Sequence, residues 1–278
     1  MEIGMLLFVM LCAKAAGYEN LFETAPALSI FMVIGTTIII GSVMVTFLKN
    51  QAREYKTAYK SYFVERIATE SFTDLHYNHE KGLDKSLLDN TQMVNTGDRY
   101  TSNDLIIGKY KNVSFTQADV IIEKEIELEK SSSFYKIFKG QFMIFEFTKK
   151  FNYGLEVVSN SFKAYIIPKH NPHTQRKYEE IVVESPNFTK KFKVYAEDGF
   201  EAFYLLSPTL IEKIERLNSN YRKGMLLCFI GNKLYLGIDN GKDAFEPPRP
   251  FKKIDEKIEI NKIQQHIKLI TDYIDSLS

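Results

Sequence analysis

Histidines are the first side chains with which this 278-residue chain could do metal chemistry. His76 and His79 stand three residues apart in HYNHE, whereas a zincin-type zinc helix needs His-Glu-x-x-His. His170 and His173 flank a proline in KHNPHTQRK, and nothing in their spacing brings together the three or four ligands of a transition-metal site. We therefore expect no metal centre and no cofactor.

Acidic and nucleophilic side chains could support catalysis, but their pattern is weak. Glu184, Glu197 and Asp198 could supply a carboxylate pair, yet Asp198 precedes a glycine, where aspartate is favoured for backbone reasons. The chain has no Gly-x-Ser-x-Gly elbow, and no motif places a histidine beside Cys12 or Cys228. We expect no catalytic residues, and an enzyme is unsupported by the sequence.

Composition narrows the classes of function further. The 36 basic and 35 acidic residues leave a net charge of +1, which argues against nucleic-acid binding through a strong basic field. The 21 phenylalanines and 16 tyrosines favour half-buried strands, so a substantial sheet is expected.

An uncharged apolar segment runs from Ala27 to Leu48. As a helix it would be roughly 33 Å long, enough to cross the hydrocarbon core of a bilayer. Basic residues mark the cytoplasmic end of a span, and here five follow the segment: Lys49, Arg53, Lys56, Lys60 and Arg66. The sequence therefore predicts a transmembrane helix at 27–48 within a membrane anchor at 1–48, with residues 49–278 in the cytoplasm.

A second apolar run, Ile3 to Ala13, has two interpretations. It could be a signal peptide, although the basic n-region is missing. Alternatively, residues 3–16 form a short first helix of a membrane hairpin.

The segment at 49–73 is expected to be an amphipathic juxtamembrane helix. Tyr55, Tyr59, Tyr62, Phe63 and Ile67 recur on its apolar face at spacings of three to four. Residues 74–103 are polar, and the stretch NTGDRYTSND is interpreted as loop.

Residues 100–250 are predicted to form an α+β domain with a mainly antiparallel sheet and packed helices. DLIIGKY, NVSFTQADVIIEKEIELE, KGQFMIFEFT and GLEVVS have the composition of strands. KKFKVYAED and EAFYLLSP are interpreted as a hairpin that turns at Asp198-Gly199. A helix should begin at Ser207-Pro208, and a second hairpin should turn near Gly231-Asn232.

The last segment, 251–278, is expected to be an amphipathic helix. Its apolar seam consists of Ile260, Ile263, Ile267, Ile270, Ile274 and Leu277. The seam is short for a coiled coil, so docking against the chain's own domain is favoured over an oligomer or partner contact.

Several motifs within the predicted α+β domain resemble one bacterial family, catalogued as domain of unknown function 3137 and often encoded beside LemA-type membrane proteins. The most specific motifs are Phe138-Lys139-Gly140-x-Phe142 and Glu184-Ser185-Pro186-x-Phe188, followed by Phe192, Val194 and Asp198. The resemblance covers roughly Tyr100 to Glu246. It implies a bacterial inner-membrane protein with a cytoplasmic α+β domain, and it implies no reaction.

The sequence thus favours a membrane-anchored, non-catalytic interaction or scaffold module facing the cytoplasm. Its partners would be the lipid bilayer and either a LemA-type membrane protein or a second copy of the chain. The alternative is a domain that binds a ligand or lipid headgroups, or an enzyme, at the membrane surface.

Overall fold

The computed structural model describes Lys14 and residues 26–128, 131–151, 153–167, 169–219, 223–250 and 252–277. The chain divides into two units, Met1–Thr57 and Ala58–Ser278, so the compact unit begins well before the predicted boundary at residue 100. Both predictions for residues 3–16 fall outside the described residues, apart from Lys14.

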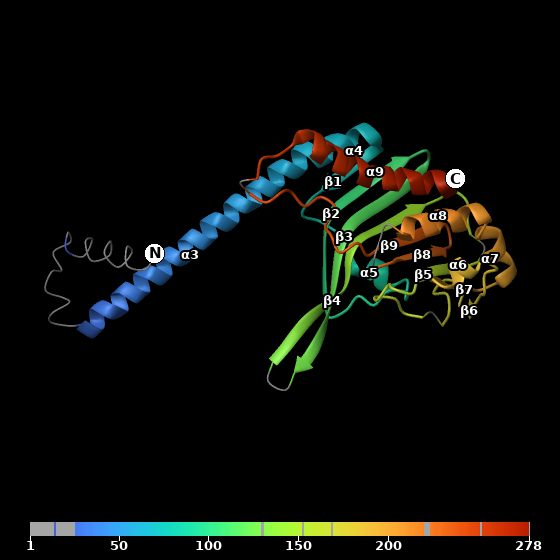
Figure 1. The fold of residues 1–278 in the computed structure, drawn as a ribbon, viewed down its shortest axis with the longest axis horizontal. Coiled ribbons are helices and arrows are strands. Elements are labelled where there is room, and N and C mark those ends of the chain that lie inside the picture. Colours follow the sequence, from blue (N-terminus) through green and yellow to red (C-terminus); the bar gives the residue numbers. More distant parts are fainter. Residues whose placement is uncertain are drawn as a thin grey trace. The chain divides into compact units, whose positions relative to one another are not determined.

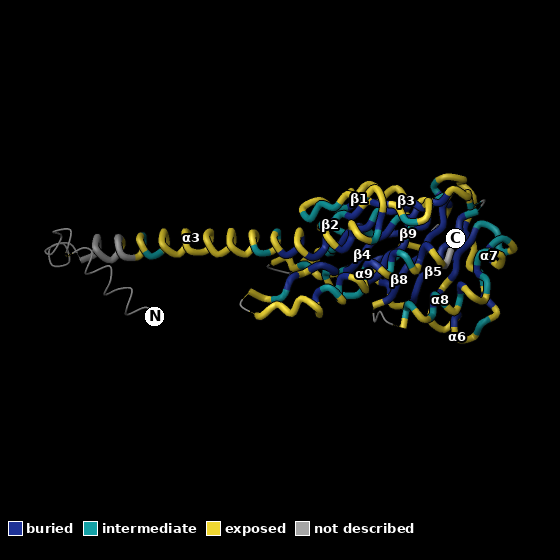
Figure 2. Tube along the Cα trace, turned by 90° about the horizontal axis from the view of Figure 1, so that it is seen from above, coloured by how far each residue is buried: buried dark blue, intermediate teal, exposed yellow. Residues whose placement is uncertain are grey.

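Helix α3, Pro26–Tyr59, contains the apolar segment and continues through the basic residues that follow it. Its described apolar side chains are exposed, for example Phe31 at 73% and Ile38 at 65%, and Figure 2 shows this stretch almost entirely in the exposed colour. Within the described part of the chain, however, no helix is both long enough and apolar enough to cross a membrane. The helix predicted at Ala27–Leu48 is therefore present, but its role as a span is not supported.

Two short helical segments continue the chain into the compact unit. They are the π-helix η1, Lys60–Glu65, and helix α4, Arg66–Ser71. The predicted aromatic stripe is buried at Tyr59, Phe63 and Ile67, whereas Tyr62 is 53% exposed. Lys60, the first residue of η1, is also buried, on the same side of the helix as Val64 and Ala68.

A large antiparallel sheet confirms the predicted α+β class. In the described residues, nine strands follow the order β1-β2-β3-β4-β9-β8-β5-β7-β6 (Figure 1). Their bounds are Thr73–Asn78, Arg99–Tyr110, Val113–Leu128, Ser131–Glu146, Leu155–Ser159, Glu179–Glu180, Phe192–Ala196, Met225–Ile230 and Lys233–Ile238, for β1 to β9 in turn. The strand predicted to be central, QFMIFEF, lies in β4 between β3 and β9.

Two local predictions were wrong. The stretch interpreted as loop, NTGDRYTSND, forms the start of β2 from Arg99 onward. The polar residues before it include most of β1 and the short helix α5, Lys85–Asp89. At Asp198-Gly199 no hairpin forms, and helix α7, Gly199–Leu205, begins there instead. The Asp198 carboxylate accepts hydrogen bonds from the backbone N–H groups of Phe200 and Glu201, at 2.8 and 3.2 Å. Aspartate favours both turns and helix N-caps, and the cap prevails here.

Each face of the sheet carries its own hydrophobic core. One core joins sheet residues such as Phe145 and Leu236 to helices η1, α4, α6 (Pro186–Thr189), α7, α8 (Pro208–Ser219) and α9 (Glu256–Leu277). Figure 1 shows α8 and α9 lying over the sheet. The other core, which includes Phe138 and Phe142, is covered by residues such as Leu88, Met93 and Phe162.

Gly140 is required where β4 approaches β9. A Cβ atom there would lie 1.9 Å from the carbonyl oxygen of Ile238, which is backbone that has no room to move aside. The glycine of the Phe138-Lys139-Gly140 motif is thus needed for β4 to pass this close to the end of β9.

Candidate functional site

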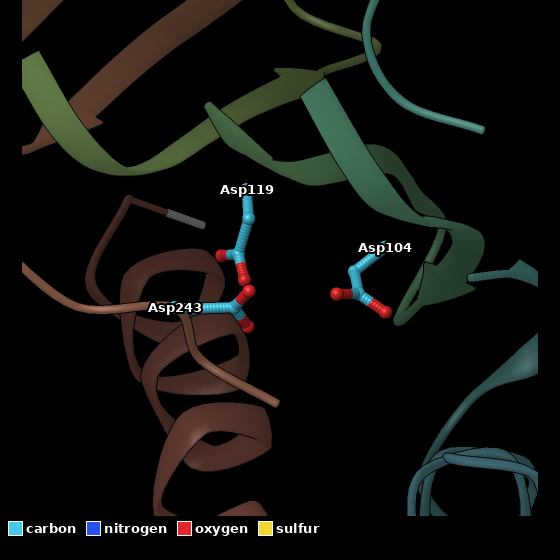
Figure 3. A group of neighbouring side chains, drawn as sticks. All are labelled: Asp104, Asp119 and Asp243. Carbon is cyan, nitrogen blue, oxygen red and sulfur yellow. The ribbon is translucent and has the colours of Figure 1, made fainter. Parts of the chain in front are cut away.

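Three aspartates from distant parts of the sequence meet beneath the helix-covered face of the sheet. Asp104 belongs to β2, Asp119 to β3, and Asp243 to the loop after β9. One carboxylate oxygen of each lies within 4.8 Å of the others, and Figure 3 shows the Asp119 and Asp243 carboxyl groups almost touching. Asp104 is fully buried and Asp119 is 4% exposed, so the charges are largely removed from water.

The local structure of β2 and β3 explains how two of these carboxylates enter a core. The β2–β3 register shifts between Asn103 and Ile106, and Asp104 has φ of +58° at this irregularity. Bulges re-aim side chains in this way, and aspartate tolerates left-handed backbone. Asp119 shares a face of β3 with Phe115 and Gln117, both buried against the helices.

Lys60 of η1 supplies the cation that Asp104 needs. Its Nζ lies 2.5 Å from Asp104 Oδ2, and the two side chains are only 7% and 0% exposed. Asp104 also accepts hydrogen bonds from the Tyr77 hydroxyl and the Asn103 amide, each at 2.6 Å. Burial raises the pKa of Asp104 above its ordinary value, while Lys60 and Tyr77 oppose the rise.

Asp119 and Asp243 form a carboxyl–carboxylate pair. Asp119 Oδ2 accepts a hydrogen bond of 2.8 Å from the backbone N–H of Ala244, and its Oδ1 has no other donor among the described residues. Burial, and then the negative charge of Asp243, raise the pKa of Asp119 well above its usual range. Burial acts to raise the pKa of Asp243 too, but the hydrogen bond from Asp119 and the charge of Lys60 lower it. The opposite directions of these two pKa shifts favour one proton shared by the pair, held on the Asp119 side.

Three carboxylates are ligands that Mg²⁺ or Ca²⁺ would accept. Here, however, the Lys60 ammonium already pairs with Asp104, and the backbone N–H of Ala244 already donates to Asp119 Oδ2. The residues present therefore fit an internal ion-pair network better than a metal centre. The network connects η1 to β2, β3 and the loop after β9. Its role is therefore to hold these elements together.

The proton on Asp119 leads to a pH-dependent prediction. A carboxyl whose folded pKa is raised contributes stability that is fully present below its unfolded pKa and is lost as pH rises through the folded pKa. In Asp119→Asn the amide mimics the protonated carboxyl and cannot lose its proton. We expect the unfolding free energy of this variant, relative to the native chain, to increase from pH 5 to pH 9.

Urea unfolding of the full chain in mild maltoside detergent, followed by circular dichroism, measures this difference. The exposed Asp275→Asn is the control, because its carboxylate is 41% exposed and should give an offset that does not vary above pH 5. A constant offset for Asp119→Asn would show that Asp119 is ionised throughout this range.

An apolar groove lies elsewhere in the same unit, beside helices α6, α7 and α8. Its volume is about 680 Å³. Its lining consists of Val183, Glu184, Ser185, Phe203, Leu206, Pro208, Ile211, Glu212 and Glu215, and we call it the α7 groove. Three exposed apolar side chains occur in the same part of the sequence: Val182 at 74%, Phe200 at 70% and Tyr204 at 73%.

The basic residues interpreted as topology signals do not share one environment. Lys49, Arg53, Lys56 and Arg66 are exposed, as that interpretation requires. Lys60 is 5% exposed and belongs to the acidic network.

The isoleucine seam lies inside the chain's own core. Ile263, Ile267, Ile270 and Ile274 are at most 4% exposed and pack in the core shared with η1 and α4. Ile260 is partly buried there, and the side chain of Leu277 is outside the described residues. The Tyr59 hydroxyl donates a hydrogen bond to Glu259 on the same helix. The side chains that a partner helix would contact are thus already covered.

The other residues considered for chemistry do not converge. His76 lies on β1, and His170 pairs with Lys177 in an isolated bridge. Among the described residues, no histidine belongs to a group of three or more metal-ligand side chains. Glu184 lines the α7 groove, and Asp198 caps α7.

Sequence reasoning missed the acidic network, although one signal was available. NVSFTQADV alternates as a strand, and Gln117 and Asp119 interrupt the apolar face that Phe115 begins. Two polar residues on the buried face of a central strand indicate an internal polar network. Nothing in the sequence shows that Lys60 would join this network as the partner of Asp104.

The fold and the site define an α+β protein with a wide antiparallel sheet and a buried Lys–Asp network. The chain belongs to the family described as a protein of unknown function, DUF3137, which matches residues 136–278, slightly more than half of its length. Among solved structures, it is similar to the crystal structure of the mycobacterial trehalose monomycolate transport factor A, TtfA. That similarity has 10% identity and a TM-score of 0.41, and it covers 80% of this chain and 96% of the other. No curated protein matches the chain.

Proposed function

We propose that this chain is a membrane-anchored, non-catalytic protein-interaction module of the bacterial inner membrane, with residues 49–278 in the cytoplasm. The observation that carries the proposal is the exposed apolar surface of α3. In this arrangement the helix holds the compact unit, Ala58–Ser278, beside the membrane.

The apolar surface of α3 supports the anchor. Residues 27–48 carry no formal charge, and described side chains such as Ile34, Ile39, Val43 and Phe47 are 50% exposed or more. Moving one such side chain out of water is worth about 1.5–3 kcal/mol, so the segment as a whole strongly favours lipid.

The charges after the apolar segment support the orientation. Lys49, Arg53 and Lys56 follow it within eight residues and are exposed. Basic residues near the end of a span are retained on the cytoplasmic side. The family resemblance adds a LemA-type membrane protein as a candidate partner.

Fractionation of bacteria that produce the full chain tests the anchor. We expect the chain in the membrane pellet, resistant to high salt and released by detergent. Ile39→Asp combined with Val43→Asp should move it to the supernatant, because a charge in the apolar core of a bilayer costs about 2.5–3.5 kcal/mol. The matched control is Ile258→Asp, since Ile258 on α9 is 62% exposed. Native chain in a detergent-free supernatant would refute the anchor.

Purification of the tagged full chain in mild detergent tests the interaction role. We expect a partner to co-purify reproducibly at a fixed ratio. Repeated recovery of the chain alone would contradict the role.

A second candidate is a domain that binds lipid headgroups or acts enzymatically at the membrane surface. The exposed basic residues on α3 favour it, because anionic headgroups attract such clusters. The double variant described above, Ile39→Asp with Val43→Asp, separates the two proposals when it is mixed with neutral or anionic vesicles. Binding only to anionic vesicles, at low salt, would favour the second candidate.

A further inference from the structure

We propose that the α7 groove binds a basic, apolar segment of a partner protein. The inference rests on the proposed interaction function and names the chemistry of the partner. The groove is far from the acidic network in sequence, and none of its lining residues contributes to that network.

The floor of the groove is apolar and preformed. Val183 and Leu206 are 7% and 4% exposed, while Phe203 at the edge is 49% exposed. The volume of about 680 Å³ falls in the range typical of ligand sites, about 300–1,000 Å³. An apolar side chain of a partner can therefore be buried there without rearrangement of the backbone.

The rim of the groove is acidic. Glu184, Glu212 and Glu215 line it, and none of its lining residues is a lysine or arginine. Glu212 and Glu215 lie three residues apart, on one side of α8. Lys213 and Arg216, the basic residues of α8, each follow one of these glutamates in the sequence. They therefore lie about 100° further around the helix than the glutamates do.

The rim carboxylates are only weakly engaged within the chain. Glu215 pairs with Lys191 at 3.9 Å, a distance too long for a hydrogen bond, and its Oε1 has no hydrogen-bond partner in the described residues. Because Glu215 Oε1 is closed to solvent, an incoming ammonium or guanidinium group would first meet the exposed carboxylates of Glu184 and Glu212.

An exposed aromatic surface accompanies the groove on the short helix α7. Phe200 and Tyr204 contact each other edge to face, with ring centroids 5.2 Å apart, yet both remain at least 70% exposed. Phe203 of the same helix reaches the groove itself. Aromatic residues exposed around a pocket are typical of interaction surfaces, because they bury a large area at little cost in conformational entropy.

The Glu184-Ser185-Pro186-x-Phe188 motif builds one wall. Phe188 is fully buried and stacks on Phe192, with centroids 4.6 Å apart, which anchors α6 to the sheet. With α6 fixed, Glu184 and Ser185 just before it face the groove. The motif therefore has a physical role in shaping this surface.

The charge of the rim distinguishes a protein segment from a membrane surface. Bacterial lipid headgroups are anionic or zwitterionic, and three carboxylates would repel an anionic surface. A peptide with lysine or arginine beside apolar residues satisfies both the rim and the floor. The observations thus favour a protein partner.

Fluorescence anisotropy tests the inference with the full chain in maltoside detergent. The probe is a fluorescein-labelled octapeptide of alternating lysine and leucine, compared with the same peptide carrying glutamate in place of lysine. We expect the basic peptide to bind at least tenfold more tightly, with an affinity that falls as salt rises.

Two variants locate the binding. Glu212→Gln with Glu215→Gln should weaken binding of the basic peptide about fivefold to tenfold, and Phe203→Ser should weaken it by a similar factor. Both change partly exposed positions, and circular dichroism checks that they fold. The control, Glu125→Gln with Glu127→Gln, removes the same charge from exposed positions on β3 and should leave the affinity unchanged.

The inference would be overturned if the control pair Glu125→Gln with Glu127→Gln weakened peptide binding as much as Glu212→Gln with Glu215→Gln. Equal affinity of the native chain for the basic and acidic peptides would also overturn it. No effect of Phe203→Ser would also overturn it. If the peptide fails while a partner still co-purifies, the groove assignment alone is wrong. If the basic peptide binds with the expected dependence on peptide charge and salt while the chain is found in the detergent-free supernatant, the groove assignment is supported and the membrane anchor is refuted.

Discussion

Replacement of Lys60 by methionine is expected to lower the free energy of unfolding by about 3–5 kcal/mol at pH 7. The substitution keeps most of the side-chain volume and removes the charge that faces Asp104 at 2.5 Å. Asp104 then remains buried with only the neutral donors Tyr77 and Asn103. The loss of unfolding free energy arises from the buried Asp104 carboxylate that no longer has a cation beside it. It is therefore larger than the net stabilisation that the ion pair provides.

The loss should depend on pH in a defined direction. The pKa of Asp104 is already raised by burial, and Lys60 is the main group that lowers it. Without Lys60 the pKa rises further, and a raised carboxyl pKa costs stability as pH increases through it. Urea unfolding of the full chain in maltoside should therefore show a smaller defect at pH 5 than at pH 8.

A second substitution should rescue the first. Lys60→Met combined with Asp104→Asn removes both charges, while asparagine tolerates the positive φ and still accepts the Tyr77 hydrogen bond. We expect most of the lost stability to return. Lys111→Met is the matched control, because its ion pair with Asp275 is also short, at 2.8 Å, but exposed, and it should change stability little. A Lys60→Met chain as stable as the native one would mean that Lys60 is solvated.

Lys60 is buried and Lys111 is exposed, and the sequence around each lysine does not predict this difference. Local patterns predicted most strands, the β8–β9 hairpin, and α8 with its Ser207 cap, because periodicity and turn chemistry act over a few residues. Lys60 was interpreted with its basic neighbours as a topology signal. Its ion-pair partner is Asp104, 44 residues later, and nothing in the residues around Lys60 signals that pairing.

The same limit explains the errors around α7. Asp198-Gly199 is compatible with a hairpin turn and with a helix N-cap, and only the packing of Ala202 and Leu206 into the core selects the helix. The α7 groove could not be predicted, because its lining spans residues 183–215 and depends on the angle between α7 and α8. The exposed aromatic residues that accompany it looked like strand residues in the sequence.

Truncation of the buried isoleucines of α9 provides the second large effect. Ile263→Ala and Ile267→Ala should each lower the free energy of unfolding by about 2–5 kcal/mol, since each leaves a cavity in a closed core. Ile258→Ala on the same helix should change it little, because Ile258 is 62% exposed. Urea unfolding of the three full-chain variants measures the contrast.

This contrast decides what the isoleucine seam does. If the seam served a partner helix, Ile263→Ala would leave the isolated chain as stable as before and would change only its assembly state. The structure instead places Ile263 and Ile267 in the same core as Phe63 and Ile67, at the point where the chain leaves α3.

Loss of α9 packing should therefore loosen η1, and with it the Lys60–Asp104 pair. We expect Ile263→Ala and Lys60→Met to be non-additive in a double-mutant cycle, with a coupling free energy of about 0.5–3 kcal/mol. Strict additivity would mean that α9 and the acidic network stabilise the fold independently.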